Sequence, residues 1–288
     1  MNNDEPASNG GLIRLRLDIS YDGEYFNGWA RQEKLRTVQG ELEKIFGYIF
    51  FAETPLTCAG RTDSGVHARG QVAHMDVPED KWREIEAQGL YRLNRALADD
   101  VRILAVQVAA PDFDARFSAL ARTYSYRIAD GAVGPLPLNR KSVLAWADRL
   151  DDEAMKQASD LLLGEHDFIA FCRRREFATT IRTIQAFSWE RTSEYLCATI
   201  TADAFCHSMV RSLMGALTAV GEGRKPIEWP ASMLNATVRA SDVPVLPPHG
   251  LTLEHVRYPS EAELAARAAD TKRRRQRPDY RESVHGSH

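Results

Sequence analysis

The segment CAGRTDSGVHARGQ, residues 58–71, contains a single carboxylate, Asp63, among arginines, a histidine and glycines. Glycine loses more conformational freedom on folding than other residues, so a loop rich in it usually allows a close approach of the backbone to something. The segment therefore predicts a site built around one carboxylate.

Two common motifs share parts of this pattern. Gly60 and Gly65 have the spacing of a phosphate-binding loop, but Val66 and His67 stand where that loop requires Lys and Ser or Thr, which excludes it. The triplet at Asp63 also matches an aspartic protease, which needs a second carboxylate sharing one proton. The chain has no second such triplet, so this interpretation stays open only for a homodimer.

Arginines are candidate partners for Asp63. If the chain is extended, Arg61 lies on the same face as Asp63 and favours its ionised form, which suits a nucleophile or a positioned base. Arg211 lies in the apolar segment FCHSMVRSLMGAL, and a buried guanidinium is costly unless it is paired. The alternatives are a purely structural ion pair for Arg61 and a solvent-reaching side chain for Arg211.

Tyr124 and Tyr126 share one face of an expected strand, downstream of Arg116 and Arg122. Aromatic rings beside arginines can stack on nucleic-acid bases and contact phosphates, although packing in the core is the alternative. The histidines His67, His74, His166 and His207 form no metal-ligand motif, so we expect no metal site. The cysteines lack CxxC spacing, and we expect all four to be reduced.

Hydrophobic periodicity indicates an α+β protein of two similar subdomains that meet at a sheet. Short links between the elements favour antiparallel pairing. We expect strands over residues 12–20, 56–59, 71–77, 101–108, 121–129, 181–191 and 195–205, and helices over residues 37–49, 81–97, 151–163 and 205–220.

The chain has 288 residues and a net charge of −3, which argues against a uniformly basic nucleic-acid binder but not against a local basic groove. No apolar run has the length of a membrane span, and the N-terminus lacks the apolar core of a signal peptide, so we expect a cytoplasmic protein. Residues 1–10 are expected to be disordered. Residues 259–288 are expected to form a basic tail.

Several segments together resemble one family. CAGRTDSGVHARGQVAH resembles the active-site motif of the tRNA pseudouridine synthase A family, and YDGEYFNGWARQ resembles its opening segment. The segments LNRALADDVRI, DFDARFSALARTYSYRI, LLGEHDFIAF, FCHSMVRSLMGAL and PPHGLTLEHVRYP follow in the family's order, so the resemblance extends from Leu12 to Pro259. Ala30 and Ala98 depart from the family pattern at positions outside the chemistry.

This resemblance implies a pseudouridine-synthase fold, with two ferredoxin-like subdomains sharing a largely antiparallel sheet and a central basic cleft. The N-terminal subdomain would span 11–110 and the C-terminal one 111–258. The family consists of homodimers that convert uridine to pseudouridine at positions 38 to 40 in the anticodon arm of tRNA, without a cofactor or a metal.

The resemblance also assigns roles to individual residues. It implies Asp63 as the catalytic aspartate, Arg61 and Arg211 as its salt-bridge partners, Tyr124 as the residue that stacks on the uracil, and Leu251 as an apolar contact. Whether Asp63 attacks C1′ or removes the C2′ proton stays open, and Tyr124 as a base at C5 is a further hypothesis. The alternative function is a non-catalytic RNA-binding protein that uses the same cleft.

Overall fold

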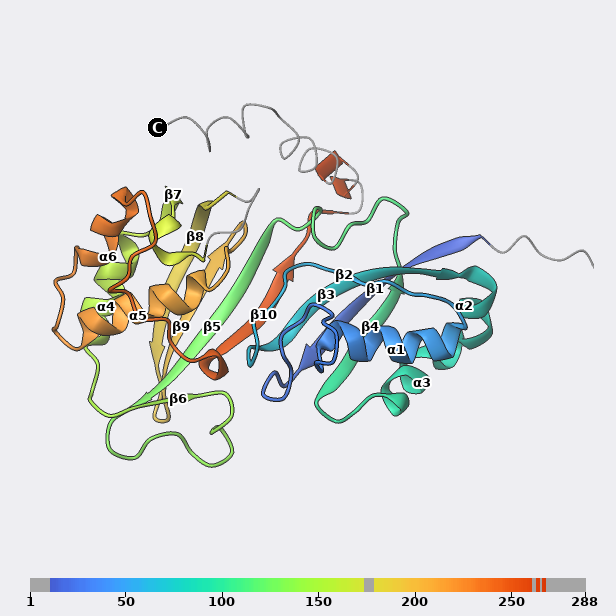
Figure 1. Cartoon of the computed structure of the whole chain (residues 1–288), viewed down its shortest axis with the longest axis horizontal. Helices are drawn as coiled ribbons and strands as arrows, with labels where there is room; N and C mark the ends of the chain where they lie inside the picture. Colours follow the sequence, from blue (N-terminus) through green and yellow to red (C-terminus); the bar gives the residue numbers. More distant parts are fainter. Residues whose placement is uncertain (1–10, 174–178, 261–262, 265, 268–288) are drawn as a thin grey trace, which may run out of the picture.

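The computed structural model describes residues 11–173, 179–260, 263–264 and 266–267. These residues contain one ten-stranded sheet with the order β4-β1-β3-β10-β5-β9-β8-β7, in which β2 adds to β3 and β6 to β5 (Figure 1). Its strands are β1 Leu12–Tyr21, β2 Thr57–Cys58, β3 His67–Pro78, β4 Val101–Val108, β5 Ala121–Asp130, β6 Leu144–Trp146, β7 Gly164–Asp167, β8 Ile181–Arg191, β9 Leu196–Ala202 and β10 Leu251–Arg257. Most pairs are antiparallel, which confirms the predicted α+β class.

The helices lie in two groups, one at each end of the sheet (Figure 1). They are α1 Val38–Phe50, α2 Glu79–Ile85 and α3 Gly89–Ala96 in the first group, and α4 Asp152–Asp160, α5 Met209–Gly221 and α6 Trp229–Ser232 in the second. Helix α1 begins after Thr37, whose hydroxyl accepts a hydrogen bond from the Gly40 N–H, as an N-cap does.

The predicted helix over 81–97 is wrong in its continuity. A 3₁₀ turn over Glu86–Gln88 separates α2 from α3, and the chain turns so that Gly89 packs against the Trp82 ring, where a Cβ atom would lie 3.0 Å from the ring carbons. Such a contact is tighter than most Cβ contacts, so glycine suits this position, and the helical pattern of the sequence does not show the break.

The two predicted halves meet where β10 lies between β3 and β5. Leu253 pairs in parallel with Ala68 of β3 and in antiparallel with Tyr124 of β5. A Cβ atom on Gly70 would lie 2.2 Å from the Glu254 carbonyl oxygen, so Gly70 serves the contact between these strands rather than the approach of a nucleotide. The sheet is continuous, and the subdomain boundary at residue 110 stays a prediction.

Two further expectations are corrected. Helix α5 begins at Met209 rather than near Phe205, because Ser208 adopts a left-handed conformation with φ of 64°. Cys172 and Cys206 form a disulfide with their Cα atoms 5.8 Å apart, so the expectation of four reduced cysteines is wrong for this pair. Their separation of 34 residues provides no local sequence signal.

Within the described ranges, no helix is long and apolar enough to span a membrane, and no group of three or more His, Cys, Asp or Glu side chains could hold a metal ion. The predicted disordered N-terminus and nearly all of the predicted basic tail lie outside the described residues.

Candidate active site around Asp63

The loop that carries Asp63 joins β2 to β3 and is held by the last residue of β1 and the segment that follows it. The Tyr21 and Thr62 hydroxyls are hydrogen bonded at 2.8 Å, and the Trp29 N–H donates to the Thr62 carbonyl at 3.1 Å. Gly28 has φ of 85°, and a Cβ atom there would lie 2.9 Å from the Thr62 carbonyl oxygen. The glycine-rich opening segment therefore buttresses the residue directly before Asp63.

The Asp63 carboxylate contacts donors that come from one short stretch of chain. The His207 Nε2 atom lies 3.2 Å from Oδ1, and the Arg211 Nη1 atom lies 3.4 Å from Oδ2. The Ser208 hydroxyl donates to Oδ2, also at 3.4 Å. None of these contacts is with a second carboxylate of this chain, as a protease dyad within one chain would require.

Arg211 contacts Asp63, which is the pairing that the family resemblance implies. Its Nε atom also donates to the Leu246 carbonyl at 2.7 Å, and the Leu246 N–H donates back to the Arg211 carbonyl at 3.2 Å. The guanidinium is thereby anchored from behind and bridges the chain before β10 to the loop before β3.

The predicted ion pair between Arg61 and Asp63 does not form within the described residues. Arg61 is exposed, and residues 61–63 belong to no strand. The turn in the loop comes directly after them, where the Val66 N–H donates to the Asp63 carbonyl at 3.2 Å. The face-sharing rule for strands therefore does not apply between residues 61 and 63.

Burial raises the pKa of the nearby Cys58 thiol to about 12, although the positive charges of Arg61 and Arg116 act to lower it.

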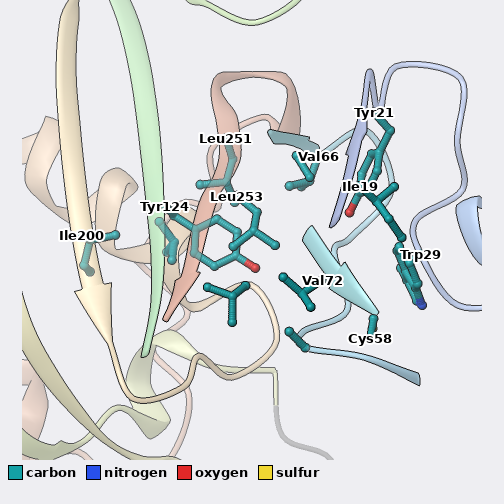
Figure 2. Close-up of a cluster of buried hydrophobic side chains, with 14 of the residues drawn as sticks. Ile19, Tyr21, Trp29, Cys58, Val66, Val72, Tyr124, Ile200, Leu251 and Leu253 are labelled. Atoms are coloured by element: carbon teal, nitrogen blue, oxygen red, sulfur yellow. The ribbon is translucent and has the colours of Figure 1, made fainter. Parts of the chain in front are cut away.

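Tyr124 and Leu251 lie on the adjacent strands β5 and β10. Figure 2 shows the Tyr124 ring beside Leu253, with Leu251 on the same strand as Leu253. Phe205 packs edge-on against the Tyr124 ring, with centroids 5.2 Å apart. Burial and then the negative charge of Asp63 raise the pKa of the Tyr124 phenol. A phenolate is therefore disfavoured, which argues against Tyr124 as the base at C5.

Comparisons with known proteins agree over nearly the whole chain. A family model described as tRNA pseudouridine synthase matches residues 158–259. The tRNA pseudouridine synthase A of Streptomyces griseus is 54% identical over 93% of this chain and 96% of its own. That of Frankia casuarinae is 56% identical over 91% and 95%, and that of Mycobacterium leprae is 47% identical over 90% and 94%. The chain belongs to the tRNA pseudouridine synthase A family.

This synthase is accordingly an isomerase that acts on uridine in tRNA, as the sequence motifs predict. Among solved structures, an H/ACA RNP bound to a substrate RNA containing 2′-deoxyuridine is 12% identical, with a TM-score of 0.33 over 71% of this chain and 44% of the other. A likeness this weak carries no argument.

Two arginines near the synthase site are structural rather than free to bind RNA. Arg122 donates to the carbonyls of Ala59 and Asp203, at 2.8 and 2.7 Å. Arg127 forms an ion pair with Glu254 at 2.6 Å. Arg127 thereby joins β5 to β10, and Arg122 joins β5 to the residues that directly follow β2 and β9.

His207 and Ser208 are the site residues that sequence reasoning missed. The expected helix over 205–220 contained a usable signal, because residues four apart share a helix face and His207 and Arg211 have that spacing. The structure brings both to Asp63 by another route, through a left-handed turn at Ser208 followed by the first turn of α5.

Proposed function

We propose that this synthase converts uridine to pseudouridine at positions 38 to 40 in the anticodon arm of tRNA, with Asp63 as the group that acts on the target nucleotide. The observation that carries the proposal is the Asp63 carboxylate, held between His207 and Arg211 beside Tyr124. The choice of positions rests on the family resemblance.

The reaction breaks the C1′–N1 bond, turns the uracil and joins its C5 atom to C1′. The C5 proton is lost to solvent and N1 takes up a proton, so that the product is an isomer of uridine. An ionised carboxylate serves both available routes, because it can attack C1′ or remove the C2′ proton. Asp63 is therefore proposed as a nucleophile or a base, and not as an acid.

The target nucleotide has to leave its stack to reach Asp63, at a cost of a few kcal/mol. Stacking of the uracil on Tyr124 would return roughly 1–3 kcal/mol, with Leu251 as an apolar contact. Because Arg61 and Arg116 are exposed cations and a phosphate backbone attracts cations, we propose that they contact backbone phosphates. This role replaces the ion pair proposed for Arg61.

The test is release of tritium from unmodified tRNA that carries [5-³H]uridine. Wild-type protein should release tritium and Asp63→Asn should release none. A tRNA that lacks uridine at positions 38 to 40 should release none with either protein. Wild-type protein that binds tRNA without releasing tritium would favour the alternative, a non-catalytic RNA-binding protein.

We also propose that the synthase acts in the cytoplasm, because tRNA is its substrate.

We further propose that the synthase is a homodimer. Strand β4 is at the edge of the sheet among the described residues. Its Leu104 and Val108 side chains are 51% and 46% exposed, and an exposed apolar edge favours association. Light scattering at micromolar concentration should give twice the chain mass of 32.3 kDa, and Leu104→Lys should reduce it. A wild-type monomer would contradict the dimer.

A further inference from the structure

We propose that His207 is a positioning residue for Asp63, donating from Nε2–H to Oδ1 while Arg211 and Ser208 donate to Oδ2. This inference rests on the proposed role of Asp63. The His207 Nε2 atom lies at ion-pair distance from Oδ1, 3.2 Å, and the Arg211 and Ser208 donors lie 3.4 Å from Oδ2. His207 and Asp63 are similarly shielded, with side chains 23% and 24% exposed.

The chain around His207 is held on both sides. The Arg173 N–H donates to the His207 carbonyl at 3.0 Å, and the Met209 N–H donates to the Cys206 carbonyl, also at 3.0 Å. Cys206 is joined to Cys172 by the disulfide. The imidazole therefore projects from a braced backbone, as a side chain that orients another group requires.

Ser208 provides a second, independent indication. It stands at the N-cap of α5, but its hydroxyl caps no helix N–H, whereas serine at this position usually does so. The hydroxyl faces Asp63 instead, and Ser208 has a left-handed backbone that is uncommon for a residue other than glycine. Such an outlier is a sign of functional constraint. The turn lacks the usual N-cap hydrogen bond, and it directs the His207 and Ser208 side chains to the Asp63 carboxylate.

Two-sided bonding has a mechanical consequence. A carboxylate bonded through one oxygen can rotate about its Cβ–Cγ bond, whereas donors on both oxygens fix the carboxylate plane. The remaining lone pairs then keep one direction relative to the flipped nucleotide, whichever route Asp63 takes. Small errors in such alignment are costly to rate. Loss of the His207 donor should therefore reduce kcat and leave KM for tRNA nearly unchanged.

The experiment compares His207→Gln, His207→Asn and His207→Phe by tritium release at saturating and limiting tRNA. Glutamine places an N–H near the position of Nε2, asparagine is one methylene too short, and phenylalanine keeps the ring but has no donor. We expect a fall in kcat of about 10- to 100-fold for Asn and Phe, the size expected for a hydrogen bond to a charged group. Gln should stay within about 3-fold of wild type.

His166→Phe is the matched control, because His166 is half-buried and its Nε2 atom bonds to the Leu163 carbonyl at 2.9 Å rather than to Asp63. Melting temperatures and tRNA Kd values are measured for every variant. If His207→Phe destabilises the fold, the comparison of His207→Gln with His207→Asn still tests the inference, because these two side chains differ by one methylene.

An unchanged kcat in Asn and Phe would overturn the inference. Equal losses in Gln and Asn would do so too, and so would losses that appear in KM or in melting temperature alone. Failure of the proposed function is a separate outcome, since wild-type protein would then release no tritium or Asp63→Asn would release as much.

Discussion

Arg211→Met provides the most direct test of how the site works. Methionine keeps the apolar stem of the side chain in helix α5. It removes the positive charge beside Asp63 and the hydrogen bond to the Leu246 carbonyl. At the observed 3.4 Å, two unit charges attract by ~1 kcal/mol in water and by ~5 kcal/mol at an effective dielectric constant of about 20.

The side chains of Arg211 and Asp63 are 17% and 24% exposed, so the attraction between their charges lies between these limits. We take about 2–3 kcal/mol, close to the value for hydrogen bonds to charged groups. Since ~1.36 kcal/mol corresponds to about tenfold in rate, kcat should fall by about 30- to 150-fold. Arg211→Lys should lose less, because it keeps a charge near Asp63 but cannot also hold the Leu246 carbonyl.

Tritium release under single-turnover conditions measures the effect on the chemical step. Arg191→Met is the matched control, since Arg191 is 16% exposed and pairs with Asp130 and Asp152 rather than with Asp63. That variant should lose stability and keep its turnover at a permissive temperature. If Arg211→Met turns over within about threefold of wild type while Asp63→Asn is inactive, the pair is only structural and the reasoning fails.

Three further outcomes are expected. Gly70→Ala should lower the melting temperature by several degrees, because its Cβ atom would lie 2.2 Å from the Glu254 carbonyl oxygen. Gly60→Ala is the control and should not lower it, because a Cβ atom there would have nothing within 4 Å. Equal shifts of the two variants in thermal melts would refute this. The Arg36 guanidinium lowers the pKa of Asp100. This pair should therefore stabilise the fold above the unfolded pKa of about 3.9, and its contribution should be lost as pH falls through the lower folded pKa. Acid unfolding of Asp100→Asn should lack this dependence. Thiol titration of the denatured protein should give two thiols before reduction and four after it, and four at both stages would exclude the disulfide.

Much of the fold was predictable because its signals are local. The alternation from Leu12 to Ser20 reappears as β1, with Leu15, Leu17 and Ile19 fully buried, since side chains of a strand alternate between its faces. Thr37 caps α1 for a similarly local reason. The break between α2 and α3 was not predictable, because the 3₁₀ turn over Glu86–Gln88 contains neither Gly nor Pro to signal it.

The sequence by itself determined the chemistry of this protein: a single motif carboxylate, Asp63, and an arginine in an apolar segment that had to find a partner, because burying an unpaired charge is costly. Only the tertiary structure decided which groups hold Asp63. Arg61 stays exposed in an irregular part of the loop, and a left-handed residue before α5 brings His207 and Ser208 to the carboxylate. These contacts join residues about 145 positions apart, and no spacing rule reaches that far, because strand and helix periodicities describe only neighbours within one element.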